Sequence, residues 1–418
     1  SLFFYAYWDL RFLPLLIVSV MLNWICSQLH ASYPYRSILI AGVALNLLII
    51  GFFKYTNFII GNLAATAGGG FAPWNIILPL GISFFTFQQI SYLVDLKRGA
   101  APVYPFHKYL LYVTFFPQLI AGPIVRHDEI IGQYALDPMR EGVYERLSKG
   151  FVLLFIGLFK KMILADTVAE TASFLFNDAA AGNTLSFYGA WVAAAAYTLQ
   201  IYYDFSGYSD MAIGLGSMFG LSIPVNFNAP YLAVSIRDFW RRWHITLSRF
   251  LRDYLYIPMG GSWFGVPRQM TALIITMLLG GLWHGAGWTF VVWGGLHGLA
   301  LVANHIWGKT GVSLPTSFGW ILTLIFVVFG WVIFRADNMG TAVAIIRSMV
   351  GMNGVSFDLP DIMPPIRLFY FALPAFIGPT SQRLVEHWLR PRPIYAAVVA
   401  CALFYMALKA GDGDYSEF

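Results

Sequence analysis

Residues 317–334 read SFGWILTLIFVVFGWVIF, a run without a single charged side chain. An α-helix needs about 20 mostly apolar residues to cross the hydrocarbon core of a bilayer, so this run can form a membrane helix. Comparable runs recur along the 418-residue chain, in which 58% of residues are hydrophobic and 11% are Asp, Glu, Lys or Arg. A soluble domain carries about 25% charged residues, and the composition therefore excludes a soluble globular enzyme, a disordered chain and a coiled coil.

The apolar runs together predict an all-α polytopic membrane protein with about ten to twelve transmembrane or re-entrant helices. They are unbroken, whereas the strands of a β-barrel alternate over roughly 10 residues. Segments 106–125 and 204–221 hold Pro, Gly or Asp in apolar surroundings, and we expect a broken or re-entrant helix in each. Regular spans are expected at 11–29, 37–60, 74–94, 150–164, 186–203, 268–283, 288–306, 317–334, 366–380 and 394–409.

No Ser- or Pro-rich linker divides the chain, and we expect residues 1–418 to form a single membrane domain. The first residue is Ser1 rather than Met, and an apolar aromatic stretch follows at once, without the features of a signal peptide. Residues 414–418 end the sequence equally abruptly. We therefore expect a segment of the natural protein to be missing at each end.

The net charge is +5, and the positive-inside rule places the basic residues in cytoplasmic loops. No clustered basic module of the kind that binds nucleic acid is present, so nucleic acid is not an expected partner. The stretch 237–253 has five arginines against two aspartates, and it predicts one amphipathic helix in contact with membrane lipids at the cytoplasmic interface. As a helix it places five polar residues on one face: Arg237, Arg241, His244, Ser248 and Arg252.

His284 is the clearest candidate for chemistry, because it lies between Gly280-Gly281-Leu282-Trp283 and Gly285-Ala286-Gly287-Trp288. An ionisable side chain among membrane segments is costly, which makes it a functional candidate. The flanking glycines allow close backbone approach or a helix break. We expect a general base, since the ordinary histidine pKa of about 6.5 suits proton transfer near neutral pH.

The sequence offers little support for other chemistries. His284 and His297 lie thirteen residues apart, with no carboxylate close to His284 in sequence, so we expect no metal site. Neither the G-x-S-x-G motif of hydrolases nor a Gly-rich phosphate loop occurs. Asp204 and Asp210 either line a polar cavity or pair with the arginines of 237–252, and of these we expect ion pairing.

Several motifs resemble those of a known family. Residues 241–248, RRWHITLS, followed by DYLYIPMGG at 253–261, resemble the central signature of the membrane-bound O-acyltransferases. Residues 281–286, GLWHGA, resemble the segment that holds the essential histidine of that family. Through nearly the whole chain the resemblance is to the bacterial branch that contains the alginate O-acetylase membrane component. The supporting stretches are 122–126, 157–161, 203–210 and 227–231.

The resemblance implies a helical fold around a central tunnel, with His284 and His244 as catalytic residues. The donor in this branch is acetyl-CoA, which is a substrate, and no bound cofactor or metal is implied. Either His244 or a backbone N–H would then stabilise the oxyanion of the transition state. Further candidates for the tunnel or for donor binding are Trp243, Arg237, Arg241, Ser248, Asp204, Tyr208 and Trp283.

The resemblance also implies transfer of acetyl across the bacterial inner membrane to an exported polysaccharide. Alginate is the first expected acceptor, followed by peptidoglycan or another exopolysaccharide, and then by D-alanylation of teichoic acid from a carrier protein. A periplasmic SGNH-type acetyltransferase is the expected partner, because the chain carries no large soluble domain to hold a polymer. The alternative is a polysaccharide or lipid transporter or flippase, which fits the composition but not the two histidine signatures.

Overall fold

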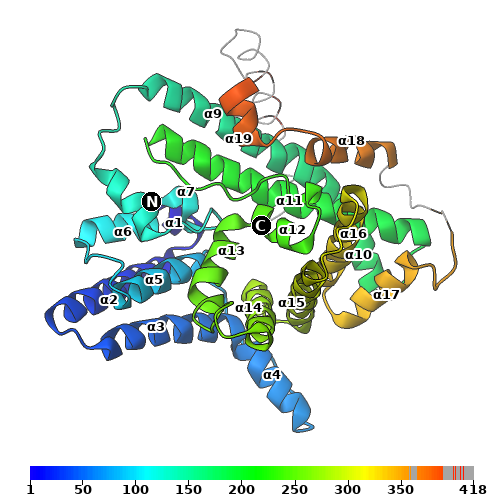
Figure 1. The fold of residues 1–418 in the computed structure, drawn as a ribbon, viewed down its shortest axis with the longest axis horizontal. Helices are drawn as coiled ribbons and strands as arrows, with labels where there is room; N and C mark the ends of the chain where they lie inside the picture. Colours follow the sequence, from blue (N-terminus) through cyan, green and yellow to red (C-terminus); the bar gives the residue numbers. More distant parts are fainter. Residues whose placement is uncertain are drawn as a thin grey trace. The chain divides into compact units, whose positions relative to one another are not determined.

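The computed structural model describes residues 1–356, 358 and 365–388, together with positions 399, 401, 405 and 408. Every regular element within these residues is helical, and none of them is a strand (Figure 1). The all-α class predicted from the sequence is therefore confirmed. The expected span at 394–409 lies outside the described residues, apart from those four isolated positions.

Among the described residues, four helical stretches are long and apolar enough to cross a membrane. Only 22% of the most apolar part of one of them is buried inside the protein, and its Leu47 and Leu48 are exposed. Apolar surface of this extent needs a nonaqueous neighbour, and lipid supplies it. The class of polytopic membrane protein is confirmed. The four stretches are Leu10–Ser32, Arg36–Thr66, Trp288–Lys309 and Thr316–Arg335.

The chain packs into two compact groups of residues, of which the first comprises residues 1–146 and 216–224. Buried polar pairs join its main helices: Asn46 Nδ2 donates to Asn23 Oδ1 at 2.6 Å, and Gln89 Nε2 donates to Ser19 Oγ at 3.0 Å. Such hydrogen bonds stabilise the association of membrane helices, because the hydrophobic effect does not favour contact between helices that lie in lipid. The helices are α1 (Leu2–Trp8), α2 (Leu13–Ser32), α3 (Arg36–Ile50), α4 (Thr56–Thr66), α5 (Ile82–Lys97), α6 (Phe106–Thr114), α7 (Phe116–Leu119) and α8 (His127–Ile130).

Two expected spans of this group have different outcomes. Helix α5 begins at Ile82, so the span 74–94 is wrong in its first part, where Pro79 lacks the backbone N–H that a helix needs. Gly81 has a φ of 70° and lies so close to Leu119 that a Cβ would be 2.5 Å from the Leu119 carbonyl oxygen. The break predicted within 106–125 is confirmed, since α6 and α7 are separate helices.

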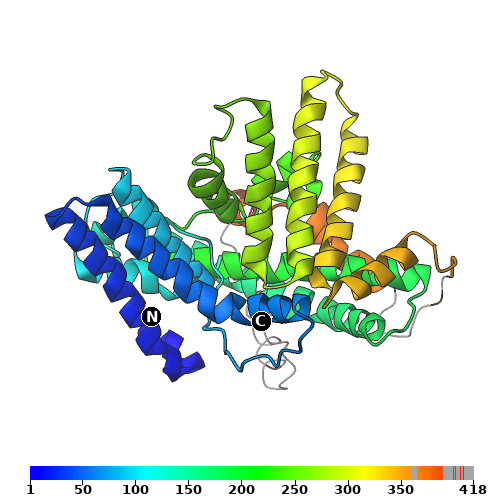
Figure 2. The same ribbon diagram turned by 90° about the horizontal axis from the view of Figure 1, so that it is seen from below.

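The second group comprises residues 147–215 and those from 225 onward, and it contains both His244 and His284. Figure 2 shows three of its helices, α14, α15 and α16, side by side as a row. The helices are α9 (Val143–Phe159), α10 (Asp166–Ala180), α11 (Phe187–Met218), α12 (Ile236–Arg242), α13 (Ile245–Leu251), α14 (Val266–His284), α15 (Trp288–Lys309), α16 (Thr316–Arg335), α17 (Met339–Met349), α18 (Pro365–Phe376) and α19 (Ser381–Arg383), with the ends of α9 and α11 extending beyond the group.

Helix α11 is continuous, so the break expected within 204–221 is wrong. The two carboxylates of this helix are neutralised by lysines: Asp204 lies 2.8 Å from Lys161, and Asp210 lies 2.7 Å from Lys160. The lysines belong to a π-helical turn between α9 and α10. A buried carboxylate with a cationic partner can remain on a regular helix, because the partner removes the need for a water-filled gap.

Candidate active site

The helix predicted for residues 237–253 is broken at His244, so that prediction of one continuous helix is wrong. The backbone of His244 has a φ of 43°, in the left-handed region that a residue with a Cβ rarely adopts. Strain of this kind persists only where surrounding contacts enforce it, and it is common at functional sites.

Residues 226–228 provide those contacts. The N–H of Asn228 donates to the Arg242 carbonyl, and the N–H of Ile245 donates to the Asn226 carbonyl. The N···O distance is 2.9 Å in both hydrogen bonds. Both bonds are made to a segment distant in sequence, and they replace bonds that a continuous helix would make within itself. The turn is therefore a product of tertiary structure.

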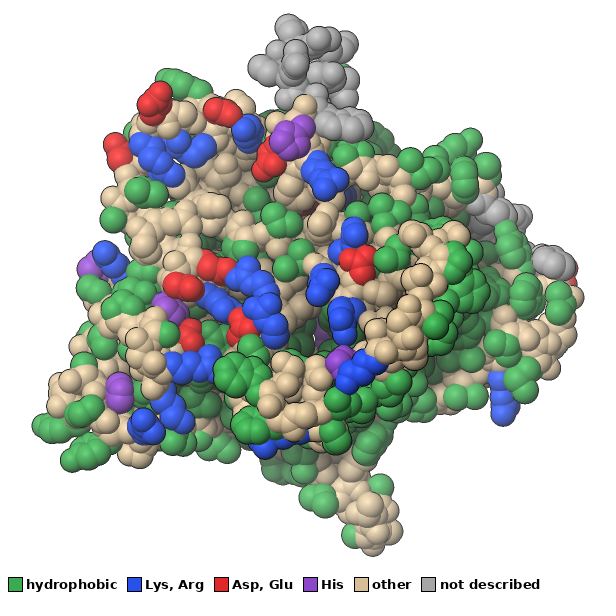
Figure 3. Space-filling model, in the orientation of Figure 1, with side chains coloured by type: hydrophobic (Ala, Val, Ile, Leu, Met, Phe, Trp, Pro, Cys, Tyr) green, Lys and Arg blue, Asp and Glu red, His purple; other side chains and the backbone are tan. Residues whose placement is uncertain are grey.

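The break separates the residues that the sequence placed on one face. The His244 side chain is fully buried, whereas Arg237, Arg241 and Arg252 are exposed, and Ser248 is half-buried. The shared face that was predicted for these five residues is wrong, because the turn at His244 rotates the side chain inward. Figure 3 shows Lys and Arg side chains gathered over α12 and α13 on the face that it displays.

One amide side chain orients His244. The Oδ1 of Asn226, a fully buried residue, lies 3.1 Å from His244 Nδ1 and also accepts from the Thr246 N–H at 3.3 Å and the Thr246 hydroxyl at 2.9 Å. The Nδ2 of Asn226 donates to Ser209 Oγ at 3.1 Å. Burial lowers the pKa of His244 well below its usual range, and the nearby His284 lowers it further, so the imidazole is neutral near pH 7.

His284 ends α14 and is half-buried in a ring of aromatic side chains. Its ring centroid lies 4.8 Å from Trp283, 5.4 Å from Trp293 and 5.1 Å from Phe334, all with edge-to-face geometry. The Trp283 ring also lies 6.2 Å from that of His244. The fold thus brings the two histidines, forty residues apart in sequence, to the same tryptophan.

The other predicted site residues lie at different distances from the two histidines and have different partners. Trp243 packs beside this centre in an aromatic cluster, with its ring 4.8 Å from Trp331. Asp204 is ion-paired, as expected, but with a lysine of the π-helical turn and not with the arginines of 237–252. Tyr208 is half-buried on the same helix. Arg237 is exposed, and its guanidinium lies 3.5 Å from the His305 ring.

The sequence indicated no role in the centre for two of its buried residues. Asn226 precedes one of the family-like stretches, but its hydrogen bond to His244 joins residues that are 18 positions apart in sequence. His297 is 1% exposed, and its Nδ1 accepts from Trp240 Nε1 at 3.2 Å, within the aromatic cluster. Neither role follows from local spacing, because each partner lies on a different element.

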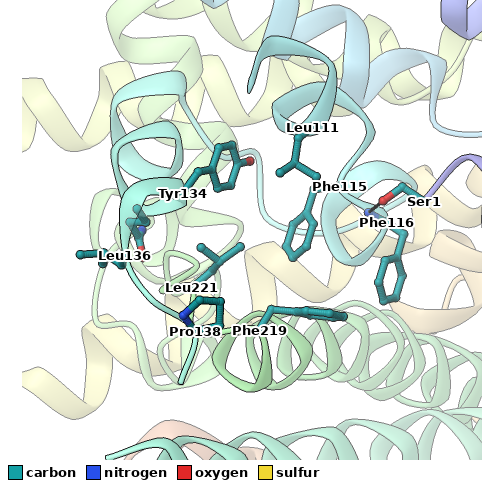
Figure 4. A pocket seen from close by; sticks show the side chains of 11 residues that line it. Ser1, Leu111, Phe115, Phe116, Tyr134, Leu136, Pro138, Phe219 and Leu221 are labelled. Atoms are coloured by element: carbon teal, nitrogen blue, oxygen red, sulfur yellow. Dashed lines mark hydrogen bonds between the residues drawn. The ribbon is translucent and has the colours of Figure 1, made fainter. Parts of the chain in front are cut away.

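Two cavities occur at other places. One, of about 360 Å³, lies in the first group, where Leu111, Phe115, Tyr134 and Phe219 surround it (Figure 4). The other, of about 480 Å³, lies where α10 and α11 meet the chain after α17. Neither borders the two histidines, and the tunnel stays a prediction. Within the described part of the chain, no three His, Cys, Asp or Glu side chains gather as a metal site requires.

Comparison with known proteins identifies the class. Residues 80–339 match the model of the MBOAT, membrane-bound O-acyltransferase family, and this range includes both histidines, Asn226 and the helices that carry them. The chain belongs to the membrane-bound O-acyltransferase family, and it is an acyltransferase. This assignment favours the enzyme over the transporter alternative.

Individual relatives cover most of the chain. It is 43% identical to the peptidoglycan O-acetyltransferase of Helicobacter pylori over 85% of its own length and 73% of that protein. It is 41% identical to the probable alginate O-acetylase of Pseudomonas aeruginosa over 82% of its length, and it spans 66% of that relative. The teichoic acid D-alanyltransferase of Bacillus subtilis is 29% identical over 63% of the chain.

Proposed function

We propose that this chain transfers acetyl from acetyl-CoA at the cytoplasmic face of a bacterial inner membrane toward a hydroxyl of an exported polysaccharide. The observation that carries the proposal is the pairing of a buried histidine and a half-buried histidine around Trp283, within the region that matches the family. The chemistry is that of an acyl transfer from a thioester, for which the centre needs a base and a site that excludes water.

His284 is the general base in this proposal. It accepts the proton of the acceptor hydroxyl as the oxygen attacks the thioester carbonyl carbon. The new C–O bond forms, the C–S bond breaks, and the proton passes from the imidazolium to the CoA thiolate, so no further reactant is required. His284 suits the task because it is half-buried and therefore reachable, whereas His244 is enclosed.

The exposed arginines of α12 and the exposed arginine that follows α13 are the proposed contacts for the donor. Arg237 and Arg241 belong to α12, Arg252 follows α13, and guanidinium groups bind phosphate with paired hydrogen bonds. CoA is phosphorylated and charged, so it remains on the cytoplasmic side while its small neutral acetyl group moves inward. No bound cofactor or metal takes part.

The acceptor is a polysaccharide hydroxyl, reached through a periplasmic acetyltransferase of the SGNH type. Relatives named for peptidoglycan and for alginate stand at 43% and 41% identity, so alginate and peptidoglycan are the two acceptors that we propose to test. The family relatives named for D-alanine transfer are less similar, at 29% and 28% identity.

The test of the base is His284→Ala. General base catalysis contributes about 10²- to 10⁴-fold, so we expect acetyl transfer from labelled acetyl-CoA to fall at least about 100-fold. The matched control is His107→Ala, which removes an exposed histidine outside the site and should leave the rate unchanged. Wild-type acetylation by a folded, membrane-inserted His284→Ala protein would exclude His284 as the base.

A further inference from the structure

The contacts of Asn226 settle which ring nitrogen of His244 carries hydrogen. The side-chain atom of Asn226 that faces His244 also receives the backbone N–H of Thr246, and a backbone N–H can only donate. That atom is therefore the amide oxygen, and an oxygen of this kind only accepts. It follows that His244 Nδ1 is the donor in the 3.1 Å contact.

A neutral imidazole has one N–H, so the second ring nitrogen of His244 is bare. This atom, Nε2, is buried and has no hydrogen-bond partner among the described residues. An unpaired buried acceptor is costly and is uncommon in folded proteins. Its presence beside the catalytic histidine indicates a partner that arrives with the substrate.

We propose that Asn226 is a positioning residue that holds His244 in the Nδ1–H form and so keeps Nε2 as a hydrogen-bond acceptor for a donor group of the substrate. This inference deepens the proposed function and rests on it. It also decides between two sources of oxyanion stabilisation. A bare Nε2 cannot donate, so His244 does not supply the hydrogen bond that stabilises the oxyanion.

The geometry around Asn226 explains how one side chain can do this. Its main-chain carbonyl accepts the Ile245 N–H, while its amide oxygen receives both donors of Thr246. Its amide nitrogen is tied to Ser209 on α11. The Asn226 amide thus cannot rotate by 180° without breaking these hydrogen bonds. Only the rotated amide would place its NH₂ group next to His244 and require Nδ1 to accept a hydrogen bond.

The first experiment is ¹⁵N NMR of histidine-labelled protein in lipid, recorded without donor or acceptor. The spectrum of His244→Asn identifies the His244 signals by their loss. We expect a protonated Nδ1 and an unprotonated Nε2 at neutral pH. A protonated Nε2 would overturn the inference, and because no substrate is present, this result is independent of the acetyl-transfer proposal.

The second experiment compares Asn226→Leu with Asn226→Asp. Leucine removes the acceptor, and orienting partners of a histidine typically contribute about 10- to 100-fold or more, so kcat should fall by that factor while His244 loses its preference for Nδ1–H. Aspartate can still accept all three hydrogen bonds, and it should retain the tautomer and most of the activity. Substitution of a residue with a merely structural role would not change which ring nitrogen of His244 carries the proton.

The matched control is Asn183→Leu, which removes an exposed asparagine paired with Asp178 and should change neither kcat nor the spectrum. Folded Asn226→Leu protein with wild-type kcat would overturn the proposal. If Asn226→Leu does not fold, Asn226→Asp decides, since loss of the Nδ1–H form in that folded variant contradicts the role assigned to the amide oxygen.

Discussion

The two histidines have different surroundings, and this difference supports the different roles that we propose for them. His244 is 0% exposed and held by an amide, whereas His284 is half-buried at the end of a helix, next to a glycine-rich connection. A group that takes a proton from a substrate has to be reached by it. A group that orients the substrate gains from being rigid, because fixed geometry lowers the cost of aligning the reacting atoms.

A prediction follows for His244. His244→Asn should retain more activity than His244→Ala, because the Asn carbonyl oxygen can accept the hydrogen bond assigned to Nε2. Loss of one hydrogen bond of this kind costs about 1–3 kcal/mol, so His244→Ala should lower kcat/KM by roughly 10- to 100-fold. Initial rates with labelled acetyl-CoA measure both variants. Equal and complete loss in the two proteins would instead indicate proton transfer by His244.

At the scale of elements, the position of His284 depends on close contact between α14 and α15. A Cβ on Gly294 would lie 3.1 Å from the Cα of Gly281, which is backbone and cannot swing aside. The turn of helix that ends in His284 follows Gly281 directly. Glycines at this contact let the two helices approach closely enough to hold the histidine among its aromatic neighbours.

Two substitutions on α15 should therefore have different effects. Gly294→Ala should destabilise the protein by about 1–3 kcal/mol, as overpacking does, and should also lower activity. Gly308→Ala adds a Cβ that meets no atom within 4 Å, and alanine favours a helix over glycine, so stability should be unchanged or slightly higher. Thermal unfolding in detergent compares the two. A Gly294→Ala protein as stable as wild type would contradict the packing argument.

The arginines of α12 and α13 predict the orientation of these elements. Basic residues next to membrane segments are retained on the cytoplasmic side, and we expect this surface to face the cytoplasm. A cysteine introduced as Arg241→Cys, in a background with Cys26 and Cys401 replaced by alanine, should react with an impermeant thiol reagent only after the cells are opened. Labelling of intact cells from outside would refute the orientation.

At the scale of the whole molecule, the chain offers helices and short connections in its described part rather than a domain that could hold a polymer. A charged polysaccharide would lose much of its hydration on entering the membrane, and this loss is unfavourable. A hydroxyl presented by a docked periplasmic protein could approach the site at lower cost. This difference in solvation supports the division of labour that we propose between two proteins.

Reconstitution tests that division. Purified protein in liposomes, with acetyl-CoA on the cytoplasmic face and alginate or peptidoglycan on the other, should acetylate little polymer until an SGNH-type partner is added. The polymer that becomes acetylated identifies the acceptor, and His284→Ala protein with the partner is the negative control. Efficient acetylation in the absence of the partner would show that this chain is the complete enzyme.

The class of protein could be predicted from the sequence, and so could the two histidines of the candidate site. Long apolar runs and a scarcity of charge specify membrane helices, because hydrocarbon excludes charged groups and unpaired backbone. The family-like motifs pointed to His284 and His244, and the glycines around His284 marked a close approach. These features are local in sequence, so they can be read without the fold.

Other features depend on contacts between segments that are distant in sequence. The amphipathic pattern of 237–253 favours one helix, but backbone bonds to residues 226–228 break it at His244 and turn that side chain inward. The carboxylates of α11 suggested a gap, but Lys160 and Lys161 neutralise them and the helix continues. In each case the deciding partner lies far away in sequence. Local propensity is weak compared with a buried hydrogen bond or ion pair, and so tertiary contacts determine the outcome.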